Sequence, residues 1–173
     1  YKRGDNNWAF YQRYLAAVEA GNSAAICPDI EEKTWQQFLG FVREKWHWRL
    51  WRSEWAIFDE STKIAGTLDA LFTIPQRDGS FRTVICDWKR FNKLRFDSRS
   101  TYVNPTQHTD INFPASNYHG AYIQLNFYQT ILSRAYKINI DFMVIVRFGE
   151  RCPEHQVHIA EANKDFKRIF DSI

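Results

Sequence analysis

Two apolar stretches of extended character, joined by a turn and carrying charged side chains inside them, constrain this chain more than any other feature. They run over 66–74 and 81–88, with Asp78 and Gly79 between them. Both stretches are apolar and contain several β-branched and aromatic residues, which predicts a β-hairpin. A carboxylate inside such a strand is costly to bury unless it is paired or holds a cation. The charges in this hairpin therefore indicate a site with chemistry of its own.

The spacing of the charged residues predicts that they share one face of the hairpin. Side chains on a strand alternate between faces, so Asp87 and Lys89 lie on one side and Trp88 on the other. A turn loop centred on Asp78 would place Asp69 directly opposite Asp87. A strict two-residue turn at 78 and 79 would instead direct the two carboxylates to opposite faces. We therefore expect a longer loop, of three or five residues, or a bulge.

Two carboxylates and a lysine on adjacent strands suit a site for Mg²⁺ or Mn²⁺. Carboxylate oxygens are the ligands that these hard cations prefer, and an amine beside them can reach the metal-bound water or a substrate phosphate. Asp69 and Asp87 would supply the carboxylates and Lys89 the amine.

A third carboxylate is expected from the strand before the hairpin. If 59–62 form the turn that leads into Lys63, then Glu54 pairs with Thr67, one step diagonal from Asp69 and on the same face. Glu54 would then join the acidic cluster and hold a second ion or its water. The alternative for Glu54 is an exposed glutamate on a strand with no part in the site.

Three short motifs in this order resemble the PD-(D/E)XK nuclease superfamily, specifically its RecB-like and phage lambda exonuclease-like branch. They are Gly-x-x-Asp at 66–69, Asp-x-Lys at 87–89 and Gln-x-x-x-Tyr at 124–128. Each motif alone is common, but here the first two fall on a predicted hairpin and the third on a predicted helix, in family order. The resemblance covers positions 54 to about 147.

The resemblance implies an α/β fold with a restriction-endonuclease-like core, a mixed β-sheet of about five strands flanked by α-helices. Period-two stretches predict strands near 49–58, 63–74, 81–89, 141–147 and 156–160, and helical periods appear at 8–20, 31–45, 118 to about 137 and 161–170. The length is that of one domain over 1–173, with N-terminal helices in 1–47 and a catalytic core in 48–173. Without an initiator Met, we expect a fragment of a longer protein.

The resemblance also implies roles for these residues. Asp69 and Asp87, helped by the backbone carbonyl of Trp88, would ligate the metal ion. Gln124 and Tyr128, one helical turn apart, would reach the metal-bound water and the scissile phosphate. Lys89 would act either by orienting the water or as a cation that stabilises the transition state, and the sequence leaves both roles open.

A basic stretch without clear periodicity follows the hairpin over 90–117 and is predicted to hold phosphates; its alternative is a solvated loop. Tryptophans in the strand before the hairpin could stack on unpaired bases or belong to the core. The candidate nucleic-acid contacts are Arg90, Lys93, Arg95, Arg99, Trp48 and Trp51.

Net charge, apolar runs and cysteine content bear on the partners and the compartment of the protein. The net charge of +3 is too small to identify a nucleic-acid partner by itself. The longest apolar run, 142–146, is too short to span a bilayer, and no membrane partner is expected. Three widely spaced cysteines argue against a disulfide framework and an iron–sulfur cluster. They favour a reducing intracellular compartment, cytoplasm or nucleus.

Together these features predict a metal-dependent nuclease that hydrolyses phosphodiester bonds in DNA with little sequence specificity, acting on single strands or ends. Both exonuclease and endonuclease action remain open. The alternatives are an RNA endonuclease of the cap-snatching kind and a catalytically silent nucleic-acid-binding domain of the same fold. A helicase or another replication or repair domain in the full-length protein is an expected partner.

Overall fold

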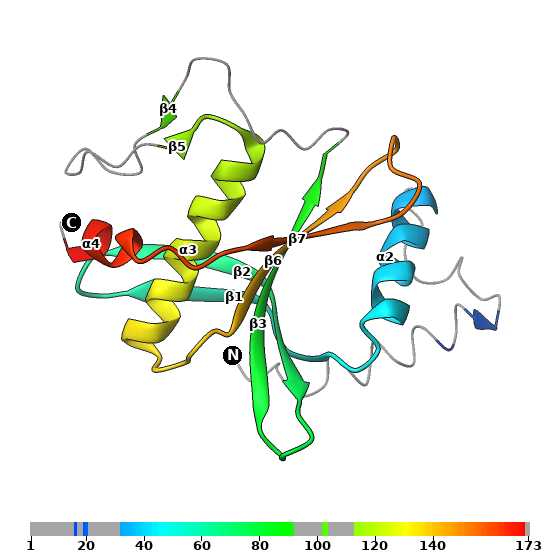
Figure 1. Cartoon of the computed structure of the whole chain (residues 1–173), viewed down its shortest axis with the longest axis horizontal. Helices are drawn as coiled ribbons and strands as arrows, with labels where there is room; N and C mark the ends of the chain where they lie inside the picture. The colour runs from blue at the N-terminus through cyan, green and yellow to red at the C-terminus, as the bar shows by residue number, and fades with distance from the viewer. Residues whose placement is uncertain (1–15, 17–18, 21–31, 92–101, 104–112, 172–173) are drawn as a thin grey trace.

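The computed structural model describes residues 16, 19–20, 32–91, 102–103 and 113–171. Its central feature is a five-stranded sheet with the order β1-β2-β3-β6-β7. The elements in chain order are α2 (Glu32–Glu44), β1 (Arg49–Asp59), β2 (Ile64–Pro75), β3 (Phe81–Arg90), β4 (Tyr102–Val103), β5 (Phe113–Pro114), α3 (Asn117–Ala135), β6 (Phe142–Phe148), β7 (Gln156–Ala160) and α4 (Asp165–Asp171) (Figure 1).

The chain has the predicted α/β architecture. β3 and β6 run parallel, as expected for strands joined through a helix, and the other neighbours in the sheet are antiparallel. The five strands begin and end within one residue of the expected bounds.

Two expectations are corrected. The stretch after β3 contains the short β4–β5 pair, and the last helix begins at Asp165, where the side-chain oxygen of Asn163 accepts a hydrogen bond from Asp165 N at 2.9 Å and caps the helix. No helix among the described residues is long and apolar enough to cross a membrane.

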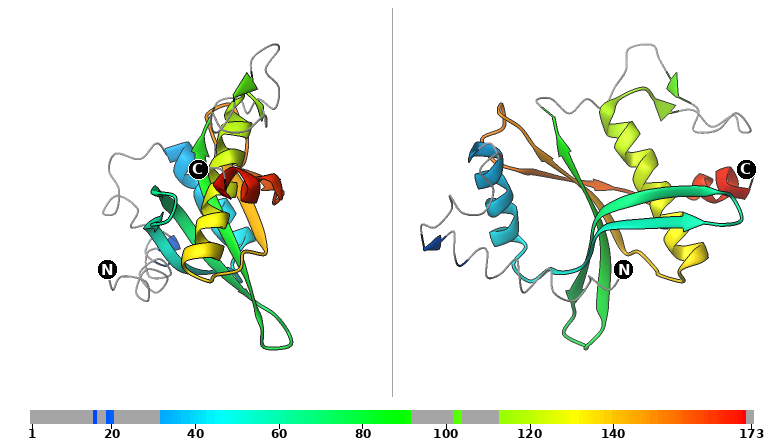
Figure 2. Two further views of the ribbon diagram at one scale, coloured as in Figure 1. Left: turned by 90° about the vertical axis from the view of Figure 1, so that its left-hand side faces the viewer. Right: turned by 180° about the vertical axis from the view of Figure 1, so that it is seen from behind.

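Helices cover both faces of the sheet because the strands alternate apolar residues to both sides. Ile85 of β3 packs in a core with Leu125 and Leu132 of α3. Its neighbours Val84 and Cys86 point the other way, into a core that contains Phe41 of α2. Figures 1 and 2 show α2 at one side of the sheet and α3 with α4 at the other. On β3, residues with odd numbers therefore face α3, and residues with even numbers face α2.

The β1–β2 hairpin bends at Asp69. The pairing of β2 with β3 ends at Ala70 and Cys86, and the rest of the hairpin lies across α3 (Figures 1 and 2). Leu68 and Leu71 both pack in the core under α3, so strict alternation fails between them. On the partner strand, Glu54 adopts a positive φ of 47°, which marks the same irregularity. The bend places Asp69 at a corner where β2 leaves β3.

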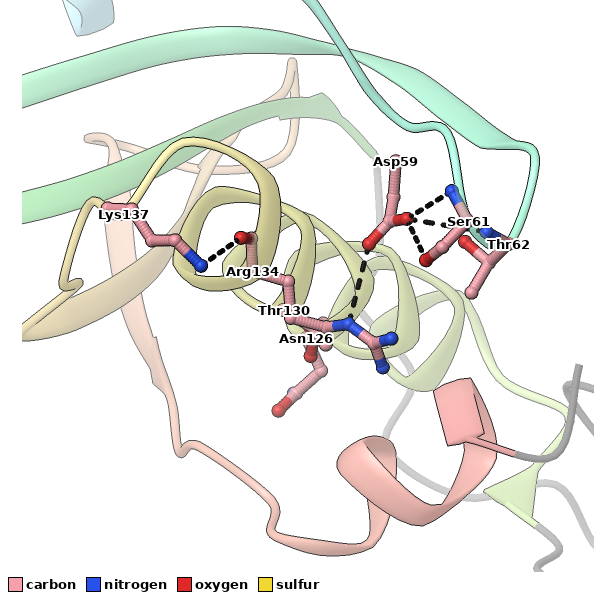
Figure 3. Close-up of polar contacts among 7 residues, drawn as sticks. All are labelled: Asp59, Ser61, Thr62, Asn126, Thr130, Arg134 and Lys137. Atoms are coloured by element: carbon pink, nitrogen blue, oxygen red, sulfur yellow. Dashed lines mark hydrogen bonds and ion pairs between the residues drawn. The ribbon is translucent and has the colours of Figure 1, made fainter.

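A buried carboxylate fixes the far end of the β1–β2 hairpin to α3 (Figure 3). Asp59 is 4% exposed and accepts hydrogen bonds from Ser61 N at 2.9 Å, from Ser61 Oγ and from Thr62 N at 3.3 Å. Its other oxygen lies 3.5 Å from Nε of Arg134 in the last turn of α3. The same helix end is held by Lys137, whose Nζ donates to the carbonyl of Arg134 at 2.8 Å. The hairpin tip and the helix are thus fixed relative to each other.

Candidate active site

The turn between β2 and β3 produces the predicted register. Pro75 pairs with Phe81 and Ala70 with Cys86, and the intervening loop closes with Gln76 N donating to Ser80 O at 2.8 Å. Gly79 supplies the positive φ of 84° that this loop requires. One further step in the same register sets Asp69 opposite Asp87. The expectation of a longer loop centred on Asp78 is confirmed.

Asp87 and Lys89 meet on the face of β3 that looks toward α3. Lys89 Nζ donates to Asp87 Oδ1 at 2.9 Å and lies 2.8 Å from Oδ2. The Asp87 side chain is 3% exposed and that of Lys89 22% exposed. Oδ2 has this close ion-pair contact but no partner in hydrogen-bond geometry. The contact between Lys89 Nζ and Asp87 Oδ2 is therefore an ion-pair contact, and the hydrogen bond of this pair is the one to Oδ1.

Asp69 lies beside this pair, and its side chain takes the place of a backbone acceptor where the pairing of β2 with β3 ends. Its Oδ2 accepts a hydrogen bond from the backbone N–H of Trp88 at 2.8 Å, just beyond the last paired residues of β2 and β3. The Trp88 ring lies on the opposite face, among Phe38, Phe41 and Phe148. The bend in β2 therefore aims the Asp69 carboxylate at β3, next to Asp87. The role of the Trp88 carbonyl as a metal ligand stays a prediction.

The helix α3 adds two polar side chains to the same site. Gln124 Oε1 accepts a hydrogen bond from Lys89 Nζ at 3.3 Å, and Gln124 Nε2 donates to Tyr128 Oη at 2.8 Å. The one-turn spacing of Gln124 and Tyr128 lets both side chains point the same way. A continuous chain of polar contacts thus runs from Asp87 through Lys89 and Gln124 to Tyr128.

Gly66 is where β2 makes room for Tyr128. A Cβ atom at this position would lie 2.3 Å from Tyr128 Cε1 and 2.8 Å from its hydroxyl oxygen. Contacts that short force atoms to move, so only glycine lets the ring lie directly on the strand. The first and third motifs of the sequence therefore touch each other in the fold.

The ionised form of Asp87 is disfavoured in this site. Burial raises the pKa of Asp87 from 3.8 to about 6, the neighbouring Asp69 carboxyl adds to the increase, and Lys89 opposes it. Burial also raises the pKa of the adjacent Cys86 thiol, with the two carboxylates contributing. A buried carboxylate beside another carboxylate is the environment that a divalent cation would stabilise.

Asp69 and Asp87 fit a magnesium or manganese ion, because such ions are commonly held by one or two carboxylates, with waters and substrate phosphates as the other ligands. The predicted pairing of the third carboxylate is corrected. Among the described residues, no three Asp, Glu, His or Cys side chains form a group able to hold a metal ion. Glu54 is exposed, and Phe58 pairs with Ala65 instead of Lys63. This register sets Glu54 opposite Asp69, between Ser53, which pairs with Ala70, and Trp55, which pairs with Leu68, and its part in the site stays a prediction.

The predicted nucleic-acid contacts have different outcomes. Trp48 is 8% exposed and packs edge-on against Phe41, so of its two predicted alternatives, base stacking and core packing, the structure shows core packing. Trp51 is half-buried, with the Arg52 guanidinium 5.4 Å from its ring centre. Arg90 is exposed at the end of β3. The remaining candidates, Lys93, Arg95 and Arg99, lie outside the described residues.

Arg147 on β6 is a site residue that the sequence patterns do not reveal, although it neighbours Lys89 in the sheet. Residue 145 pairs with Asp87 and residue 147 with Lys89, so Arg147 shares the face of the site. Part of the signal is present in the sequence, because the predicted strand at 141–147 includes Arg147. The periodicity of that strand carries no information about its register against β3.

No protein-family model matches the chain, and no curated protein matches it. Among solved structures it is similar to a protein named "Putative exonuclease" from Eubacterium rectale, with 14% identity and a TM-score of 0.43, over 98% of this chain and 64% of that one. It is also similar to a protein named SSO0001, with 16% identity and a TM-score of 0.38, over 95% of this chain and 65% of that one. The chain thus spans just under two thirds of either structure.

Proposed function

We propose that this chain is a metal-dependent nuclease that hydrolyses phosphodiester bonds in DNA, in the manner that its resemblance to PD-(D/E)XK nucleases implies. The observation that carries the proposal is the polar chain Asp87–Lys89–Gln124–Tyr128 with Asp69 beside it. These residues come from two strands and a helix, and their side chains meet at one point. Buried carboxylates whose ionisation is disfavoured cluster at functional sites.

Asp69 and Asp87 would hold Mg²⁺ or Mn²⁺. When bound, the ion would supply Lewis-acid stabilisation of a phosphoryl oxygen and a lower pKa for bound water. The side chains of the site would bind the ion and orient the Lys89 ammonium. Asp87 and Gln124 hold the Lys89 ammonium between them, so a cation stands ready for negative charge on the reacting phosphate.

Tyr128 and Gly66 act by positioning. The ring of Tyr128 rests on the backbone at Gly66, and its hydroxyl accepts the hydrogen bond that orients the Gln124 amide. With the amide nitrogen on Tyr128, the amide oxygen is directed to Lys89. The orientation of Lys89 thus depends on a contact between β2 and α3.

The test is cleavage of labelled single-stranded DNA, duplex DNA and RNA with Mn²⁺, with EDTA as the metal-free control. We expect cleavage of DNA that stops in EDTA and is lost in Lys89→Ala. The matched control is Lys164→Ala, which removes an exposed lysine before α4. Free-ended and end-blocked substrates distinguish exonuclease from endonuclease action.

Three results would contradict the proposal in different ways. Equal cleavage by the parent and Lys89→Ala would exclude this site as the catalytic centre. Cleavage of RNA alone would favour an RNA endonuclease. Metal-independent DNA binding without any cleavage would identify a silent binding domain.

A further inference from the structure

Arg147 continues the row of polar side chains that begins at Lys89. Lys89 on β3 pairs with Arg147 on β6, and Arg147 pairs with Gln156 on β7. Neighbouring strands lie about 4.8 Å apart, so Arg147 is the next side chain to Lys89 in the direction away from β1 and β2. Gln124 of α3 reaches Lys89. The row therefore extends the site across β6 toward β7.

The direction of the Arg147 side chain follows from the cores on either side of β6. Ile145, two residues before Arg147, lies in the core that α3 covers. Val146 and Phe148 lie in the core that contains α2 residues. Because side chains alternate along a strand, Arg147 is directed to the side of Ile145, which is also the side of Asp87 and Lys89.

Two hydrogen bonds orient the guanidinium of Arg147. Its Nε donates to the backbone carbonyl of Phe91 at 2.8 Å, and its Nη1 donates to Gln156 Oε1 at 2.8 Å. These two bonds fix the plane of the guanidinium relative to β6 and β7. Its positive charge is felt by its neighbour His158, whose pKa is lowered by burial and then by Arg147. A half-buried cation is thus held in one orientation beside the proposed catalytic lysine.

We infer that Arg147 binds the phosphodiester adjacent to the scissile one, so that the bound strand crosses the carboxyl ends of β3 and β6 toward β7. The inference rests on the proposed function. Lys89 is the cation proposed for the scissile phosphate, so the adjacent phosphate needs a second cation. An oriented guanidinium suits this task, because its planar fork matches two phosphate oxygens.

The test measures binding of a fluorescein-labelled oligothymidylate at several salt concentrations, with Ca²⁺ in place of the catalytic ion, for the parent, Arg147→Gln and Arg147→Lys. Loss of one phosphate contact should weaken binding about tenfold at low salt and reduce the slope of log Kd against log salt by about 0.7 in Arg147→Gln. Arg147→Lys keeps the charge and should restore the slope. In Mn²⁺, Arg147→Gln should raise KM and leave kcat nearly unchanged.

Arg82→Gln is the matched control, because it removes an exposed arginine from the opposite end of β3, where the guanidinium lies 5.3 Å from the Phe142 ring centre. It should change neither the slope nor KM. An unchanged salt slope in a folded Arg147→Gln variant would overturn the inference, since a purely structural tie between strands has no counterion to release. If Arg147→Gln does not fold, Arg147→Met takes its place: a slope reduced by about 0.7 supports the inference, and a parental slope overturns it.

Failure of this inference can be distinguished from failure of the proposed function. If the parent cleaves, Lys89→Ala does not, and the Arg147 variants bind like the parent, only the inference fails. If the parent neither cleaves nor binds the oligonucleotide, both fail.

Discussion

Replacing Asp87 by Asn should stabilise the metal-free fold at neutral pH and remove its response to Mn²⁺. The pKa of Asp87 rises from 3.8 to about 6 in the folded chain, chiefly through burial. At about 1.4 kcal/mol for each pH unit, ionising this carboxyl costs the folded state about 3 kcal/mol relative to the unfolded state. Asparagine has nearly the same shape and no charge, so the free energy of unfolding at pH 8 in EDTA should increase by up to about 3 kcal/mol.

The sign of the pH dependence follows from the raised pKa. Below pH 3.8 the carboxyl is protonated in both states, and between 3.8 and about 6 the folded chain holds a proton that the unfolded chain has lost. The contribution of Asp87 to stability is therefore largest at low pH and is lost as the pH rises to about 6. The difference in unfolding free energy between Asp87→Asn and the parent should grow over this window and stay constant above it.

The assay is urea denaturation from pH 4 to 8, with and without Mn²⁺. An ion bound only to the native parent contributes about 2.7 kcal/mol at a hundredfold excess over Kd, and Asp87→Asn should lose most of it. Glu60→Gln, which removes an exposed carboxylate in the β1–β2 turn, is the control and should keep the full Mn²⁺ response. A lower metal-free stability in Asp87→Asn, or an equal Mn²⁺ response in both proteins, would refute the reasoning about this pair of carboxylates.

Two further predictions concern the contacts that support the site. Gly66→Ala should slow Mn²⁺-dependent DNA cleavage and reduce the unfolding free energy by about 1–3 kcal/mol, because its Cβ would lie 2.3 Å from Tyr128. Gly120→Ala on α3, where a Cβ meets open space, should instead stabilise the fold by up to about 1 kcal/mol; similar effects in both variants would contradict the close-contact argument. Asp59→Ala should lower the unfolding free energy by about 1–3 kcal/mol, because it leaves the donors of Ser61 and Thr62, and Arg134, without this buried carboxylate. The pKa of Asp59 is lowered, chiefly by the Ser61 hydroxyl. The loss of unfolding free energy should therefore be present above pH 4 and disappear as the carboxylate of the parent is protonated at lower pH. A loss of unfolding free energy that persists unchanged at low pH would assign the effect to packing.

The part of the site that could be predicted from the sequence is the part set by local rules. Alternation along β3 placed Asp87 with Lys89, and the turn residues around Asp78 fixed the register that brings Asp69 opposite Asp87. Helical spacing placed Gln124 with Tyr128. These relations depend only on residues close in sequence or joined by one short loop.

Glu54 shows where local rules fail. Its predicted pairing assumed a turn at 59–62, but Asp59 pairs with Ile64, and the register shifts again between Leu50 and Arg52. The positive φ of Glu54 belongs to the bend of the hairpin across α3, which depends on packing between distant segments. No periodic pattern in the sequence predicts that bend.

The sequence left the position of Trp48 open and did not reveal the place of Arg147, for a related reason. A tryptophan on a strand is compatible with both a core and a surface position, and only the packing of α2 on that face decides between them. The closeness of Arg147 to Lys89 arises from a parallel pairing across a long connection through α3. Such a register is set by the whole fold and not by a turn.

The middle position of β3 has a consequence for how the chain can fold. Its residues Val84, Ile85 and Cys86 are fully buried, yet until β6 arrives from beyond α3 one edge of this strand has no partner. Such an apolar edge is a template for pairing with another chain. A chain cut after α3 should therefore aggregate, and the parent should be most prone to self-association early in refolding, before the parallel pair closes.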